Sequence, residues 1–345
     1  MELCYFTAAL KFSEIKINLQ MMSIFAAVAL VLTSAILSVA FPLATYTFTL
    51  AAFGLTHVLT ELHYVDNRFR QRLGNNLCWR MSQLLILIIG LRSLQVLSLI
   101  PTWLSITLEL SCVVGLVILV IPVLAKKDWR LGIFGTMLCL TLTVGIFSSA
   151  TLTLLIFAIL HNITPVGFIA EKLRGKPRNN ALFSCVVVFL LIPLLIISGI
   201  PNQVLSYLGL VGLEASLFPV GGLENHLGIF VPPQLQDEAI AISLFSAAVF
   251  LQTMHYAVVI GVLPKWEKHH KSQNEHYVFP WLVGFLSVIL FVSFTREFIH
   301  TRAVYGIIAA VHAWVEIPIL LLALAIPENS QISFQGISSQ KLSNK

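Results

Sequence analysis

The chain has 345 residues, of which 57% are apolar and only 11% are charged. Because a typical soluble domain is about one-quarter charged, this composition excludes an ordinary water-soluble protein and a disordered tail protein. The five cysteines show no C-x-x-C spacing and imply no disulfide framework. The net charge of +5 comes from basic residues between apolar runs, where they orient membrane helices, so we assign no nucleic-acid partner. The sequence predicts an all-α polytopic integral membrane protein surrounded by membrane lipids.

Ten apolar segments are long enough to cross a bilayer, which requires roughly 20 residues per helix. Pro42 divides a long uncharged run into the first two segments, and the Ser-Ser-Ala-Thr stretch at 148–151 separates the fifth from the sixth. The predicted spans are about 20–41, 43–64, 81–100, 103–124, 131–149, 152–170, 181–200, 239–263, 277–295 and 303–326.

The basic residues predict how these spans are oriented. Eighteen of the 21 Lys and Arg residues fall on one side of the predicted membrane. Arg296 and Arg302 fall on the other side, and Arg92 lies within the third span. Since Lys and Arg concentrate in cytoplasmic loops, both termini are predicted to be cytoplasmic.

The predicted organisation is a single transmembrane domain, residues 1–327, followed by a cytoplasmic tail, residues 328–345. The tail is rich in Ser and Gln and is predicted to be disordered. The one long loop, 201–238, falls on the outer side and contains four acidic residues and no Lys or Arg. We expect this loop either to form a lid or interfacial hairpin or to rest on the outer headgroups as a simple connection.

Four histidines lie inside predicted spans, where ionisable side chains are costly and mark functional positions. They are His57, His161, His255 and His312, all on even-numbered spans that run in the same direction. The first three lie nine or ten residues before the charged residue that marks the cytoplasmic end of their span. At about 1.5 Å per residue, their imidazoles share one level roughly 14 Å inside the membrane boundary. We therefore predict that the four histidines converge on one metal ion.

Two of these histidines are followed four residues later by a carboxylate, as His57 with Glu61 and His312 with Glu316. Positions i and i+4 project from the same helix face, so each pair can bind one metal, or the glutamate can hold a ligating imidazole in place. Imidazole and carboxylate together are ligands for non-haem iron, manganese or zinc. We predict four histidine ligands, catalytic roles for Glu61 and Glu316, and Fe²⁺ as cofactor, with Zn, Mn and haem b as alternatives.

Other polar residues in the apolar segments receive weaker assignments. Asn162 and Gln252 are predicted to support His161 and His255 from outside the metal's ligand shell. Arg92 is predicted to pair with Glu109 on the next helix in a structural role. His226 is expected to be solvated in the outer loop. The alternative for any one membrane histidine is a hydrogen bond between helices without a metal.

Two short elements carry a resemblance to a known family. Gly54-Leu55-Thr56-His57 followed by Glu61, and the later His312 with Glu316, resemble the H-x-x-x-D elements of the Brp/Blh-type β-carotene dioxygenases. That resemblance implies iron held by histidines on separate transmembrane helices, and carotenoid cleavage. This chain departs from the family in lacking its adjacent H-x-x-x-H pair, in placing the first motif in the second span, and in having more predicted spans.

The predicted function is an integral-membrane non-haem iron oxygenase that acts on a lipophilic substrate, such as a carotenoid or an acyl chain. A metal-ion or proton transporter is the first alternative, because His161-Asn162 is similar to the H-N element of zinc-transporting permeases. A b-type haem protein, with haem held between pairs of these histidines, is the second alternative.

Overall fold

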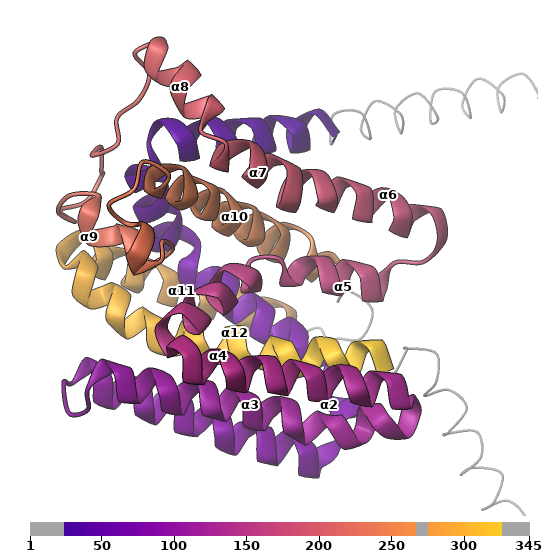
Figure 1. Cartoon of the computed structure of the whole chain (residues 1–345). Helices are drawn as coiled ribbons and strands as arrows, with labels where there is room; N and C mark the ends of the chain where they lie inside the picture. Colours follow the sequence, from indigo (N-terminus) through magenta and orange to yellow (C-terminus); the bar gives the residue numbers. More distant parts are fainter. Residues whose placement is uncertain (1–23, 267–274, 326–345) are drawn as a thin grey trace, which may run out of the picture.

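Every regular element in the described residues is a helix (Figure 1). The computed structural model describes residues 24–266 and 275–325. Eight of its helices are long and apolar enough to cross a membrane. The chain is therefore an all-α, multi-pass membrane protein. The predicted tail and both termini lie outside the described residues.

The helices follow one another with short connections except between α8 and α10. An unlabelled first helix covers Ile24–Ala40. The labelled elements are α2 (Pro42–Val96), α3 (Thr102–Lys127), α4 (Trp129–His161), α5 (Thr164–Lys172), α6 (Gly175–Val186), the π-helical turn η1 (Val187–Leu191), α7 (Ile192–Ile197), α8 (Ile200–Tyr207), α9 (Glu224–Leu227), the 3₁₀ turn η2 (Pro233–Leu235), α10 (Ala241–Gly261), the 3₁₀ turn η3 (Leu263–Trp266), α11 (Glu275–Arg296) and α12 (Phe298–Ala325).

Helix α2 contains two spans, Pro42–Arg70 and Arg72–Val96. They are joined near Gly74, whose φ of 70° is in the left-handed region. Glycine adopts this backbone without the steric cost that a Cβ would impose. The second and third predicted spans are therefore present, and both continue as helix into the basic segment between them.

Helix α4 folds back on itself at Ser149, where φ is −167° and ψ is 100°. A Cβ at Gly145 would lie 2.6 Å from Thr153 Oγ1, so the two halves approach closely on either side of this residue. The break predicted at 148–151 is thus a sharp turn within one helix. The predicted sixth span is then interrupted after His161 and continues as α5.

The number of long helices differs from the ten predicted spans for two reasons. The fifth and sixth predicted spans both lie in α4, which is counted as one helix although the turn at Ser149 divides it into two helical halves. The described part of the first prediction, Ile24–Ala40, is too short to count as a span by itself.

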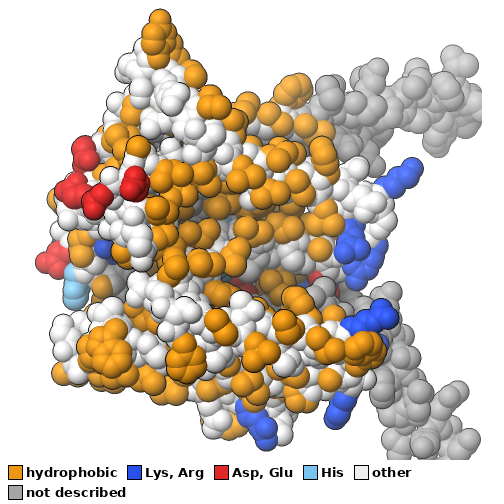
Figure 2. Space-filling view, in the orientation of Figure 1, with side chains coloured by type: hydrophobic (Ala, Val, Ile, Leu, Met, Phe, Trp, Pro, Cys, Tyr) orange, Lys and Arg blue, Asp and Glu red, His pale blue; other side chains and the backbone are white. Residues whose placement is uncertain are grey.

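The centre of the bundle is built around α2, which packs against α3, α10, α11 and α12. Figure 1 shows these long helices lying alongside one another, with α3 and α4 on one flank and α6 and α7 on the other. Figure 2 shows apolar side chains across the middle of the visible face, with most Lys and Arg at one end and most Asp and Glu at the opposite end. An apolar band between two charged ends is the surface that a bilayer requires.

Candidate metal centre

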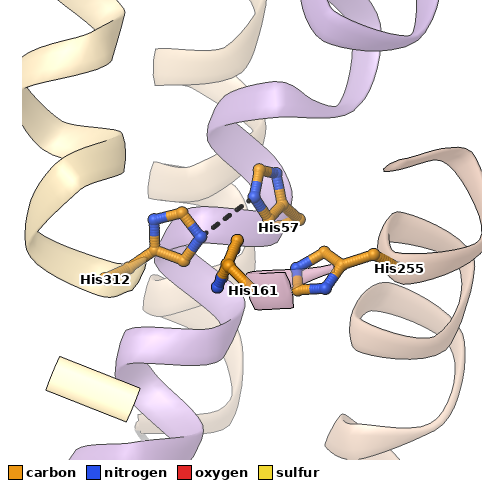
Figure 3. Close-up of side chains that lie close together, drawn as sticks. All are labelled: His57, His161, His255 and His312. Carbon is orange, nitrogen blue, oxygen red and sulfur yellow. Dashed lines mark hydrogen bonds between the residues drawn. The ribbon is translucent and has the colours of Figure 1, made fainter. Parts of the chain in front are cut away.

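The four predicted histidines meet at one point inside the bundle (Figure 3). One ring nitrogen from each lies within 4.8 Å of a ring nitrogen of every other. His57 Nε2 and His312 Nε2 are 3.2 Å apart. With metal–nitrogen bonds of about 2.1 Å, neighbouring ligands lie roughly 3 Å apart and opposite ligands roughly 4.2 Å apart. The spacing of the four imidazoles is therefore close to that of ligands around a single ion.

Each of the four histidines comes from a different helix. His57 and His312 lie near the middle of a long membrane helix, in α2 and α12, and His255 lies in the C-terminal half of α10. The rings of His57, His255 and His312 are almost completely buried. His161 keeps 12% of its side chain exposed. A cluster assembled from four helices depends on the tertiary fold and cannot form locally.

His161 occupies the last position of α4 for a local reason. Pro165 has no backbone N–H and so cannot bond the carbonyl four residues earlier, which is that of His161. The hydroxyl of Thr164 donates to this carbonyl instead, at 2.6 Å. The helix therefore ends at His161, and its side chain projects into the bundle at the break between α4 and α5.

The two glutamates contact histidines on other helices. Glu316 Oε2 accepts from His161 Nδ1 at 2.8 Å, and Glu61 Oε2 lies 3.3 Å from His255 Nε2. The i, i+4 spacing led us to expect each glutamate beside the histidine of its own helix. Instead each glutamate contacts a histidine on another helix. Glu61 of α2 contacts His255 of α10, and Glu316 of α12 contacts His161 of α4, so these contacts join the two pairs of helices.

Several polar atoms in this cluster are buried without a hydrogen-bond partner among the described residues. They are both carboxylate oxygens of Glu61, Oε1 of Glu316, both ring nitrogens of His255 and Nδ1 of His312. Glu61, Glu316 and His312 also place one ligand atom each within 4.8 Å of one another. Leaving such groups unpaired in a low-dielectric interior is costly. A divalent cation would offset the charge of the two carboxylates, so the donor set fits a metal ion.

Tyr256 also belongs to this site, and the sequence reasoning missed it. Its ring stacks on His57 with centroids 3.9 Å apart and planes 25° apart. It directly follows His255, so α10 presents neighbouring residues to the cluster and to its flank. The sequence feature that could have identified it is a tyrosine inside a predicted membrane span, next to the candidate ligand His255.

The weaker assignments had different outcomes. The side-chain amides of Asn162 and Gln252 form hydrogen bonds with groups other than the four histidines: Asn162 donates to carbonyls of its own helix, and Gln252 donates to Thr49 Oγ1 at 3.5 Å. The prediction that His226 is solvated is wrong, because its side chain is fully buried. Its Nε2 donates to Val220 O and its Nδ1 accepts from Arg302. Burial lowers the pKa of His226 below its usual value.

The predicted Arg92–Glu109 pair is confirmed. Arg92 donates to both carboxylate oxygens of Glu109, at 2.7 and 2.8 Å. Trp314 Nε1 donates to the same carboxylate at 2.6 Å. Because Trp314 lies between His312 and Glu316 in sequence, this ion pair also fixes the helix that supplies part of the histidine cluster.

Comparisons with known protein families, with curated proteins and with solved structures find no match to this chain.

Proposed function

We propose that the chain is a membrane metalloenzyme in which His57, His161, His255 and His312 hold one transition-metal ion, with Fe²⁺ the expected ion. The observation that carries this proposal is the convergence of four ring nitrogens from four helices to within 4.8 Å of one another. Neutral imidazoles offer the metal four nitrogen ligands, and the two carboxylates balance a divalent charge in a medium of low dielectric.

Glu61 and Glu316 act in this proposal as positioning residues. By accepting from His161 Nδ1, Glu316 leaves Nε2 of the same ring for the metal. Glu61 lies against His255 at the other ring nitrogen, Nε2, at 3.3 Å, which leaves Nδ1 of that ring without a carboxylate among the described residues. Carboxylates that contact ligating histidines fix the tautomer and the ring orientation and raise the basicity of the ligand.

The geometry favours a bare metal over haem. Two axial imidazoles can lie about 4 Å apart across a haem iron, but the plane between them is filled by the porphyrin ring. Here two further imidazoles reach into the same small volume. The second alternative from the sequence, a b-type haem, is therefore disfavoured.

We further propose an oxygenase that acts on a lipophilic chain such as a carotenoid or a fatty-acyl group. Iron held by four neutral imidazoles keeps coordination positions open and supplies the chemistry of dioxygen activation. The chain's own residues exclude water, because the site lies among buried aliphatic and aromatic side chains of α2, α10 and α12. The exposed edge of His161, beside exposed Ile156 and Leu160 on α4, gives an apolar approach to the site.

The orientation with both termini in the cytoplasm is also a proposal. The segregation of basic and acidic side chains to opposite ends of the helices supports it (Figure 2). The likeness of the two H-x-x-x-E elements to the Brp/Blh-type dioxygenases remains a reason to choose a carotenoid as the first substrate to test.

The oxygenase is tested with iron-loaded protein in detergent, supplied with β-carotene or with an unsaturated fatty acid. We expect oxygen uptake with one of these substrates and a cleaved or oxygenated product. The His312→Ala variant should show neither, while His300→Ala, which changes an exposed histidine, should retain both. Iron-loaded protein that consumes no oxygen with either class would contradict the oxygenase and leave the transporter as the alternative.

A further inference from the structure

His57 differs from its neighbours in how its ring is held. His161 and His255 each lie against a carboxylate. The Nδ1 atom of His57 faces backbone carbonyls of its own helix, with that of Phe53 at 3.4 Å, and its Nε2 faces His312. Within the described residues, no carboxylate lies at either ring nitrogen of His57. Its ring plane must therefore be fixed by something else.

One face of the His57 ring is covered by Tyr256. The two rings stack with centroids 3.9 Å apart and planes 25° apart. Tyr256 is buried, so this contact is not shared with water. A large aromatic ring against the imidazole blocks its rotation and keeps Nε2 directed toward the other histidines.

Tyr256 is itself held by a second tyrosine. Its hydroxyl hydrogen-bonds that of Tyr305 on α12. Tyr305 donates its own proton to the carbonyl of Gly54, at 3.3 Å, so Tyr256 is the donor of the pair. An added Cβ at Gly54 would lie 3.3 Å from Tyr305 Cζ, which is tighter than an ordinary contact. Glycine at this position lets the tyrosine ring approach.

These contacts form a closed circuit. Gly54 lies three residues before His57 on α2, so the path from His57 through Tyr256 and Tyr305 returns to the same turn of the same helix. The circuit includes α2, α10 and α12, which supply three of the four candidate ligands. A shift of any one of these helices would therefore change the orientation of the His57 ring.

We propose that Tyr256 and Tyr305 are positioning residues that set the ring plane of His57, as Glu61 and Glu316 do for His255 and His161. This inference rests on the proposed metal centre. It assigns to two buried tyrosines the task that carboxylates perform for His161 and His255, without adding a third negative charge to the membrane interior. The loss of a residue that supports a metal ligand typically lowers metal affinity about 10- to 100-fold.

The test uses Co²⁺ titration of metal-free, detergent-purified full-length protein, followed by the visible absorption of the bound ion. Tyr256→Leu should weaken Co²⁺ binding on the order of 10-fold and alter the spectrum. Tyr256→Phe keeps the stack and should bind with near wild-type affinity. Tyr305→Phe removes both the acceptor for Tyr256 and the bond to Gly54, and should alter the spectrum with a smaller loss of affinity.

Phe245→Leu is the matched control. Phe245 is a fully buried aromatic residue on the same helix, ten residues before His255, where it packs against Tyr46 and Phe230. This variant should lose packing without a change in the Co²⁺ spectrum. Folded Tyr256→Leu with unchanged affinity and spectrum would overturn the proposal, and so would an unchanged spectrum in Tyr305→Phe if Tyr256→Leu does not fold. Wild-type protein that binds no Co²⁺ would overturn the metal centre itself, and this inference with it.

Discussion

Helix α12 contributes to two buried polar clusters that differ in how their charges are satisfied. On one side, Trp314 joins Arg92 and Glu109, where both carboxylate oxygens accept hydrogen bonds from a cation. On the other, His312 and Glu316 join a cluster whose carboxylates lie against histidines and against each other, with no Lys or Arg beside them in the described residues.

The difference separates a structural ion pair from a binding site. Glu109 is completely buried, yet its negative charge is balanced by an arginine in bidentate geometry. Glu61 and Glu316 are buried equally well, but no Lys or Arg is seen against them in the described residues. A buried pair of carboxylates among neutral imidazoles is stabilised by added positive charge, which a proton or a metal ion can supply. The first cluster is complete by itself, and the second has the donor groups to hold a cation.

The largest effect is expected from removing a ligand. His161→Ala or His255→Ala should lower metal affinity by more than about 100-fold, beyond the usual effect of a supporting residue. Each helix keeps enough apolar residues to insert. Metal analysis and a membrane-insertion assay measure the two properties separately. His300→Ala is the control, and full metal content in both alanine variants would remove the metal centre.

A smaller loss is expected when the carboxylates are neutralised. Glu61→Gln and Glu316→Gln keep the size of the side chain but remove one negative charge each. Metal affinity should fall about 10- to 100-fold in each variant, as measured by competition with a chelator. Glutamine variants that bind metal as tightly as the wild type would show that the carboxylates neither orient the histidines nor balance the ion.

Disruption of the Arg92–Glu109 ion pair should lower the stability of the protein and leave its metal content unchanged. Glu109→Gln leaves Arg92 without its charge partner and should lower stability by about 2 kcal/mol, less than the 3–5 kcal/mol for a fully buried pair, because the Arg92 side chain is 24% exposed. Metal content should be unchanged. Thermal unfolding and metal analysis of the same preparation provide the comparison, and a loss of metal without a loss of stability would reverse the roles of the two clusters.

The smallest expected effect concerns the outer loop and pH. Burial lowers the pKa of His226, so below its ordinary value of 6.5 the unfolded residue binds a proton that the folded residue does not. Stability from this group is therefore present above pH 6.5 and is lost as the pH falls through the lowered folded value. The protection of the amides of residues 208–240, measured by hydrogen exchange and corrected for the intrinsic pH dependence of exchange, should fall between pH 7 and pH 5. His226→Gln should reduce this dependence, and an equal pH response in both proteins would contradict the assignment.

Helix content and the four histidines were predictable from sequence because each depends on a local pattern. Apolar runs mark the spans, and the distance of each histidine from a charged span end sets its depth. Two features were not predictable. The partners of Glu61 and Glu316 depend on which helices become neighbours in three dimensions. The turn of α4 at Ser149 was expected only as a break, since the Ser-Ser-Ala-Thr stretch does not show that the chain continues as helix on both sides.

Tyr256 and the buried His226 were missed for a related reason. A tyrosine is common in membrane helices, so its chain position alone does not predict that it will stack on His57. His226 lies in an acidic, irregular loop whose sequence is typical of solvated residues, and only the fold brings Arg302 of α12 against it.

The central claim is that four histidines hold one non-haem metal ion, and elemental analysis of detergent-purified full-length protein together with its visible spectrum tests it most directly. We predict about one equivalent of iron or another divalent transition metal per chain, with no Soret band, and its loss in His161→Ala and His255→Ala. Wild-type protein that contains no transition metal after growth with iron and retains none after reconstitution would contradict the account, as would a Soret band from bound haem.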